Sequence, residues 1–91
     1  MEITYDTAKC QRNVEERGLS FDLVRDFEWH SALIAEDVRR DYGERRYLAL
    51  GYIGERMHAL VFTPRGTAVH VISLRKANRR EVGRYEQARQ D

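Results

Sequence analysis

The sequence has one cysteine, one proline and no long hydrophobic run. A single cysteine excludes an internal disulfide and a cysteine-rich metal site. We expect Cys10 to be a small buried apolar residue rather than a catalytic thiol. The apolar stretches fall far short of the roughly 20 residues that a membrane span needs. The opening residues, MEITYDTAK, are acidic and polar, which is unlike a signal peptide, so we expect a cytoplasmic protein without membrane contact.

Several chemical motifs are also missing. The three histidines, His30, His58 and His70, have neither His-x-x-x-His spacing nor cysteine companions, so we expect no metal site. There is no phosphate-binding P-loop or dinucleotide glycine motif, and Ser73 lacks the Gly-x-Ser-x-Gly context of a serine hydrolase. His58 and His70 fall on neighbouring predicted strands and could face each other, but we favour two unrelated histidines over a catalytic pair. The sequence therefore predicts no cofactor.

Lysine is scarce, and arginine takes its place. Of the 16 basic residues only Lys9 and Lys76 are lysines. Residues 1–37 have 4 basic against 9 acidic residues (net −5), whereas residues 38–91 have 12 against 6 (net +6). Arginine keeps its charge and offers a planar fork that matches phosphate and carboxylate oxygens. This polarised charge suits an anionic ligand or an acidic protein partner, although the net charge of +1 alone predicts neither.

Ninety-one residues predict a single domain, residues 1–91, with one modest core. Residues 1–5 are expected to begin with a short strand, followed by a helix from Asp6 or Thr7 to Arg17 that ends at Gly18. Ser20 can cap a second short helix over 21–27. Strands are expected in SALIAED, RYLALGYI, MHALVFT and TAVHVISLR, with glycine-containing separators typical of antiparallel hairpins. RRDYGE is expected to be an exposed loop.

The chain should close on a helix from about Arg79 to Gln90. Asn78 is its expected N-cap, and Glu81 three residues later completes a capping-box pattern. Its apolar stripe is narrow, so we expect the helix to dock weakly unless a partner covers it. The predicted fold is thus α+β: two N-terminal helices, a three- to four-stranded antiparallel meander and a C-terminal helix, with the helices on one face of the sheet. The opposite face would be free for function.

Strand alternation then assigns side chains to faces. On the last strand it predicts that His70 and Ile72 lie on one side and that Ser73 and Arg75 lie on the other. Arg46 opens the first hairpin strand, and charges inside strands are less favoured than charges on helices or loops. Arginine, lysine, histidine and glutamate near a sheet suffice to cut RNA without a metal, because the 2′-OH of the RNA is itself the nucleophile.

Three segments of the sequence resemble the BrnT family of toxins from bacterial type II toxin–antitoxin systems. They are YDTAKCQRNVEERGLSFD, DYGERRYLALGY and HVISLRKANRREVGRYE, in the expected order over nearly the whole chain, and the third is the most specific. The resemblance implies a small ribonuclease with a RelE-like fold. It further implies that the toxin cleaves mRNA, inhibits translation and is neutralised by a cognate BrnA-type DNA-binding antitoxin, which would be the chain's only link to operator DNA.

The resemblance also assigns residues. The positions that match the family pattern are Lys9, Asn13, Glu44, Arg46, Ser73, Arg75, Lys76, Glu81 and Tyr85. Arg46 and Arg75 would hold the scissile phosphate, while His70 or Lys9 would transfer protons. The predicted RNA-binding residues are Lys76, Arg79, Arg80 and Tyr85. The chain departs from the family at Arg17, where a histidine is usual, and at His70, where an arginine is common.

Two other functions fit the same residues. A non-catalytic module could bind nucleic acid through phosphates alone, with a steep salt dependence. No recognition-helix motif precedes the basic helix, and few aromatic residues are placed to stack on bases. A protein-binding domain could instead direct its basic half towards an acidic partner. The sequence leaves open the cleavage preference, the need for the ribosome, the identity of the general base and the antitoxin stoichiometry.

Overall fold

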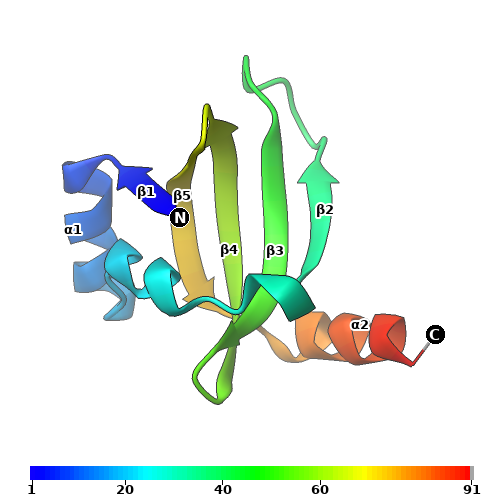
Figure 1. Ribbon diagram of the computed structural model, residues 1–91. Coiled ribbons are helices and arrows are strands. Elements are labelled where there is room, and N and C mark those ends of the chain that lie inside the picture. Colours follow the sequence, from blue (N-terminus) through cyan, green and yellow to red (C-terminus); the bar gives the residue numbers. More distant parts are fainter. Residues whose placement is uncertain (91) are drawn as a thin grey trace.

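The computed structural model describes residues 1–90, which are built around a five-stranded sheet (Figure 1). The elements in chain order are β1 (Glu2–Tyr5), α1 (Thr7–Arg17), the 3-10 helices η1 (Phe21–Asp26) and η2 (Trp29–Ser31), β2 (Leu33–Asp37), β3 (Arg46–Ile53), β4 (Arg56–Arg65), β5 (Ala68–Lys76) and α2 (Arg79–Arg89). Across the sheet the strand order is β1-β5-β4-β3-β2. The sheet therefore begins and ends with the two shortest strands.

The predicted fold class is wrong in its topology. The sheet is mixed rather than an antiparallel meander, because β1 pairs in parallel with β5, with Glu2 opposite Ala68 and Tyr5 opposite Val71. Only one N-terminal α-helix forms, since η1 is a 3-10 helix. The expectation of two N-terminal helices, three to four antiparallel strands and a RelE-like arrangement is therefore replaced by a five-stranded mixed sheet with one main helix near each end of the chain.

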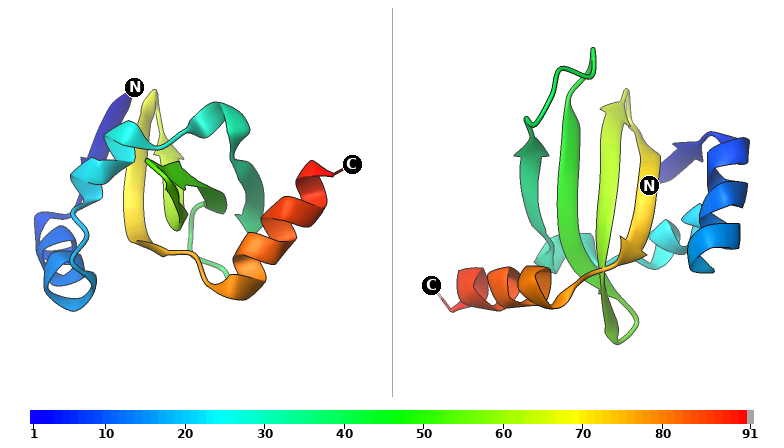
Figure 2. Two further views of the ribbon diagram at one scale, coloured as in Figure 1. Left: turned by 90° about the horizontal axis from the view of Figure 1, so that it is seen from below. Right: turned by 180° about the vertical axis from the view of Figure 1, so that it is seen from behind.

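Helical segments cover both faces of the sheet, not one as predicted (Figure 2). η1 and η2 cross the first face, where Phe21 and Val24 pack with Leu60 and Phe62 in the larger core cluster. α2 covers part of the second face, over a smaller cluster of Leu50, Met57, Ala59, Ala77 and Tyr85. Seen from behind, α2 lies across only the lower end of this face (Figure 2, right). The upper part of the second face carries no helix.

An irregularity in β5 changes which residues share a face. Val71 lies opposite Phe62 and Ser73 lies opposite Val61, so Ile72 is an extra residue in β5, as in a β-bulge. Val71 and Leu74, three residues apart, consequently both belong to the larger core cluster. His70 lies opposite Thr63, and Arg75 lies opposite Ala59. The prediction that His70 and Arg75 lie on opposite faces is therefore wrong, because simple alternation does not allow for the extra residue.

The local signals at the helix ends are confirmed. Asp6 caps α1 by accepting the Lys9 backbone N–H, and Gly18 ends the helix with a left-handed φ of 71°. Cys10 is buried as expected. Asn78 and Glu81 form the predicted capping box of α2. Within residues 1–90, no helix is both long and apolar enough to cross a membrane.

Helix α1 is attached to the outer edge of β5. The Nδ2 group of Asn13, a buried side chain, donates to the carbonyl oxygens of Leu19 and Leu74, each at 2.9 Å. β1 pairs with β5 only as far as Val71, so the Leu74 carbonyl on that edge has no partner strand. Asn13 supplies the missing donor. This contact joins the middle of α1, the helix that carries Lys9, to the C-terminal part of β5.

Candidate active site

The partly covered second face carries an ion pair where β5 meets α2. Nη1 and Nη2 of Arg75 donate to the two carboxylate oxygens of Glu81, each at 2.8 Å. The same carboxylate accepts the Asn78 backbone N–H at 3.0 Å within the capping box. The hydrogen bonds from Arg75 hold the pKa of Glu81 below its usual value and raise the pKa of Arg75. Glu81 is thus an ionised residue that joins strand and helix.

A pocket of about 430 Å³ opens beside this pair. Glu81 and Arg84 of α2 and Arg75 of β5 line one side, and Asp37 and Arg39 line the other. The side chain of Arg75 is 36 % exposed, whereas that of Glu81 is only 8 % exposed. Two N–H groups of the Arg75 guanidinium are used by Glu81, so three of its five remain for a ligand. Glu36 also lines the pocket, so its three arginines face three carboxylates, and an anion would bind through the free N–H groups of Arg75 and through Arg84.

His70 lies on the same face, nearer the opposite end of β5. Its Nδ1 is 2.8 Å from Oγ1 of Thr4, which faces it from β1. Burial lowers the pKa of His70 below its usual value, and the positive charges of Arg65 and Lys9 act in the same direction, while Glu44 opposes them. A half-buried, neutral imidazole near cationic groups has the properties of a proton acceptor at neutral pH.

Lys9 approaches the site from α1. The side chain is exposed, and with Ser73 it lines a pocket of about 190 Å³ between α1 and β5. The charge of Lys9 is near enough to lower the pKa of His70. The two predicted proton-transfer residues therefore lie on α1 and β5, two elements that the Asn13 contact joins.

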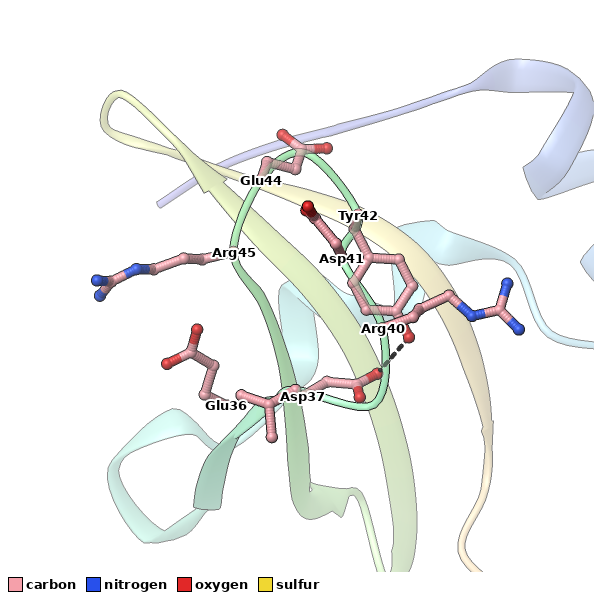
Figure 3. Close-up of a pocket in the computed structure, with 8 residues that line it drawn as sticks. Glu36, Asp37, Arg40, Asp41, Tyr42, Glu44 and Arg45 are labelled. Atoms are coloured by element: carbon pink, nitrogen blue, oxygen red, sulfur yellow. Dashed lines mark hydrogen bonds between the residues drawn. The ribbon is translucent and has the colours of Figure 1, made fainter.

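Arg46, at the start of β3, stacks on an aromatic ring. Its guanidinium carbon lies 4.0 Å from the centre of the Tyr42 ring, and its buried Nε has no hydrogen-bond partner among the described residues. The Tyr42 hydroxyl donates to Asp37 at 3.1 Å (Figure 3). Asp37 and Arg46 are opposite each other in the β2–β3 register. Continuing the Tyr47–Phe62 register by one residue places Arg46 beside Thr63, which in turn lies opposite His70.

One face of the sheet therefore carries Arg46, His70 and Arg75. Arg46 is on β3, and the other two residues are on β5, with β4 between the two strands. Strand spacings put the Cα atoms of Arg46 and His70 about 10 Å apart and those of His70 and Arg75 about 13 Å apart. Arg75 is directed to Glu81 and Arg46 lies over Tyr42, so contact with one shared phosphate requires these side chains to turn towards His70. This arrangement can combine proton transfer with stabilisation of negative charge on phosphorus.

Other predicted residues lie elsewhere. Lys76 is exposed on the first face, opposite His58, so His58 and His70 are on different faces and form no pair. Tyr85 is 6 % exposed, and its hydroxyl donates to the Ser31 carbonyl at 2.9 Å. This hydrogen bond links α2 to η2, and the prediction that α2 docks weakly stays a prediction. Arg79 and Arg80 are exposed in the first turn of α2.

Sequence reasoning missed three residues that line the site. Arg84 is not among the predicted site residues, but it lies three residues after Glu81 on the same side of α2, a spacing that could have identified it. Arg39 and Tyr42 belong to the β2–β3 loop, which the pattern predicts only as exposed. The sequence feature that could have drawn attention to this loop is an aromatic residue, Tyr42, among charged residues.

Metal ligands do not gather here. Among residues 1–90, no group of three His, Cys, Asp or Glu side chains is arranged to hold a metal ion. The chemistry described above uses only side chains that the chain itself provides.

Comparison with known proteins identifies the family. The family model for the ribonuclease toxin BrnT of type II toxin–antitoxin systems matches residues 5–81, a range that contains Lys9, Arg46, His70 and Arg75. No curated protein matches the chain. A ribonuclease toxin implies an antitoxin as its partner in such a system. Since the match covers most of the sequence, this chain belongs to the BrnT family of ribonuclease toxins of type II toxin–antitoxin systems.

Proposed function

We propose that this toxin is a metal-independent endoribonuclease that cleaves mRNA in the cytoplasm and thereby inhibits translation. The observation that carries the proposal is the placement of His70, Arg46 and Arg75 on one partly open sheet face, with the pKa of His70 lowered by burial. A neutral imidazole supplies a base, and two arginines supply fixed positive charge. This combination matches what RNA cleavage through the 2′-OH requires.

The reaction follows from these positions. Neutral His70 removes the proton of the 2′-OH, and O2′ attacks the adjacent phosphorus while the bond from phosphorus to O5′ breaks. Lys9, or the protonated His70, returns a proton to O5′. The products are a 2′,3′-cyclic phosphate and a 5′-OH, so every atom and charge is accounted for. Arg46 and Arg75 stabilise the negative charge that develops on the phosphoryl oxygens.

For His70 to accept a proton at Nε2, its Nδ1 must carry the hydrogen and donate it to Thr4 Oγ1. The 2.8 Å contact between these atoms is compatible with that tautomer. Thr4 then acts as a positioning residue that orients the imidazole. The parallel pairing of β1 with β5, which places Thr4 opposite His70, would therefore serve the chemistry as well as the fold.

Arg79 and Arg80 are proposed to contact RNA phosphates outside the cleavage point. Both are exposed at the first turn of α2, where the helix dipole also favours an anion. Lys76 and Tyr85 leave the proposed RNA site, because Lys76 faces the other side of the sheet and Tyr85 is buried under α2. Arg84 takes their place, since it lines the pocket beside Arg75.

The antitoxin partner is proposed to be of the BrnA type, with the toxin reaching operator DNA only through it. The family membership supports an antitoxin, and the charge separation between the two halves of the chain supports binding by an acidic surface. Co-expression with a candidate BrnA-type protein should give a stable complex in which RNA cleavage is blocked.

The direct test incubates the purified chain with RNA in EDTA and analyses the new ends. We expect 2′,3′-cyclic phosphates, and we expect His70→Ala and Arg75→Ala each to reduce the rate about 100-fold or more. Arg25→Ala removes an exposed charge on η1 and serves as the control. Intact RNA at high concentration of folded wild-type chain would refute the proposal. Binding without cleavage would instead support a non-catalytic nucleic-acid-binding module.

A further inference from the structure

The β2–β3 loop, residues 38–45, forms a second basic pocket together with Arg46, and its loop residues take no part in the reaction above. The pocket has a volume of about 360 Å³, and its lining consists of Arg39, Arg40, Tyr42 and Arg46. This volume lies within the range of roughly 300–1,000 Å³ that is common for small-ligand sites. Three arginines and one aromatic ring line it without a carboxylate. Among residues 1–90 only Arg39 of these is paired, with the carboxylate of Asp37, so Arg40 and Arg46 make the pocket suited to an anion.

The carboxylates of Asp37, Asp41 and Glu44 are all engaged, and Asp37 pairs with a residue of the pocket itself. Asp37 accepts from Arg39 and from the Tyr42 hydroxyl, Asp41 accepts from the Gly43 backbone N–H at 2.9 Å, and Glu44 accepts from Arg65 at 3.1 Å. Figure 3 shows the side chain of Arg40 extending away from Glu36 and Glu44. Asp37 therefore neutralises Arg39, and the uncompensated positive charge of this pocket comes from Arg40 and Arg46.

The basic groups of the pocket have unused hydrogen-bonding capacity. Arg46 lies over Tyr42 at 4.0 Å, its buried Nε has no partner among the described residues, and Arg40 is exposed. An unpaired buried N–H of a charged group is costly unless a ligand satisfies it. Tyr42 is in turn held by Asp37, so the guanidinium of Arg46 is ordered before any ligand arrives. Such pre-organisation reduces the entropic cost of binding.

The pocket is connected to the proposed cleavage site. Arg39 lines both this pocket and the larger one beside Arg75, and Arg46 shares the sheet face with His70. A chain of phosphates that passes from Arg84 and Arg75 across the face would next meet Arg39. The row of positive side chains therefore extends beyond the residues that are needed to cut one bond.

We propose that the β2–β3 loop is a second phosphate-binding subsite, in which Arg39 and Arg40 hold the phosphate of a nucleotide adjacent to the cleavage point, beside the Tyr42 ring and next to the scissile phosphate that Arg46 contacts. This inference rests on the proposed function for the identity of the ligand as RNA, but the subsite itself requires only a single-stranded nucleic acid with several phosphates. Longer oligonucleotides should therefore bind more tightly than a dinucleotide, and contacts with the β2–β3 loop should account for this gain in affinity.

The test measures binding of 2′-O-methyl oligonucleotides, which cannot be cut, by fluorescence anisotropy. The wild-type chain is expected to bind a tetranucleotide more tightly than a dinucleotide. The double variant Arg39→Ala, Arg40→Ala should lose about tenfold of this gain, as expected for one charge-assisted contact. The salt dependence of its binding should be shallower by about 0.7 log units for each phosphate that the variant no longer holds. Tyr42→Leu keeps every charge and should also reduce the gain.

Arg56→Ala is the matched control, because Arg56 is an exposed arginine at the β3–β4 turn, at the far end of β4. It should retain the full gain with length. Equal losses in the control and the double variant would reduce the effect to general charge attraction and overturn the subsite. An unchanged gain in a folded double variant, verified by circular dichroism, would also overturn it. Because cleavage is not measured, failure of the proposed ribonuclease activity would be detected separately.

Discussion

His70 and Arg75 are five positions apart in the chain, and both face the side of the sheet that α2 partly covers. In a regular strand an odd separation would put them on opposite faces. Ile72 is the extra residue that reverses the alternation between them. The bulge therefore determines whether the proposed base and the proposed phosphate clamp can act on the same substrate.

His70 should make stability depend on pH. Burial lowers its pKa in the folded chain below the unfolded value of about 6.5, so the unfolded chain binds a proton more readily. The free energy of unfolding should therefore fall as pH drops through about 6.5, and this dependence should end below the folded pKa. Urea unfolding between about pH 5 and pH 8 measures the effect.

His70→Gln should flatten that part of the profile, whereas His30→Gln, at an exposed position, should leave it in place. The same titration governs catalysis, because only the neutral imidazole can accept the 2′-OH proton. The cleavage rate should rise with pH through the folded pKa. A stability profile that is unchanged in His70→Gln would contradict the assigned burial of this side chain.

The ion pair between Arg75 and Glu81 should stabilise the attachment of α2. Glu81→Gln keeps an oxygen for the Asn78 N–H but removes the charge that faces Arg75. Because Arg75 is partly exposed, we expect a loss of about 1–2 kcal/mol in the free energy of unfolding, between the values for exposed and buried pairs. Chemical denaturation at neutral pH measures this loss.

The lowered pKa of Glu81 also determines how the stabilisation by this ion pair changes with pH. The folded pKa of Glu81 is lowered, so its stabilising contribution is present above the unfolded value of about 4.3 and disappears as pH falls through the folded value. The difference between wild type and Glu81→Gln should shrink over that acidic range. Glu86→Gln, an exposed position on α2, should match wild type throughout. A constant difference at all pH values would rule out the charge as its source.

Local sequence signals predicted most elements with their approximate boundaries. Asp6 and Gly18 define α1, and Asn78 with Glu81 defines the start of α2, because caps act within a few residues. The parallel pairing of β1 with β5 escaped prediction, since β1 has four residues and its partner begins more than 60 residues later. Nothing local in such a short strand specifies a distant partner.

The residues of the candidate site could be selected from the sequence, but their arrangement could not. His70, Arg46 and Arg75 could be selected because charged and titratable groups inside strands are unusual. Their shared face depends on Ile72, and hydrophobic alternation gives no warning of an extra residue. Arg39 belongs to the β2–β3 loop and lines the pocket beside Arg75, a placement that loop composition does not reveal.

Asn13 should be needed for the fold rather than for the chemistry. Its amide donates to two backbone carbonyls, of Leu19 and Leu74, and the side chain is buried. Asn13→Ala should reduce the free energy of unfolding by about 1–3 kcal/mol, because both carbonyls lose their donor. Asn13→Asp should cost at least as much at neutral pH, since a carboxylate cannot donate.

Gln11→Ala is the control for the Asn13 variants, because Gln11 is exposed on the same helix, and it should change stability little. Thermal or urea unfolding distinguishes the three variants. Stability in Asn13→Asp equal to that of wild type would contradict the donor role of the amide. A loss of activity in Asn13→Ala that returned at lower temperature would indicate displacement of α1, and with it Lys9.

Gly51 should be the position in β3 where the addition of a single methyl group lowers the free energy of unfolding most. A Cβ atom there would lie 2.6 Å from Cζ of Phe27 and 3.2 Å from Cβ of Ala32. Phe27 is buried and held by its backbone bridge to Ile53, so the ring cannot move aside cheaply. Gly51→Ala should therefore cost about 1–3 kcal/mol by overpacking.

Gly83→Ala is the contrasting variant, because its Cβ would meet no atom within 4 Å and the residue lies inside α2. It should gain about 0.5–1 kcal/mol from helix propensity. Equal stability of the two variants in urea unfolding would mean that Phe27 does not pack against β3 as described.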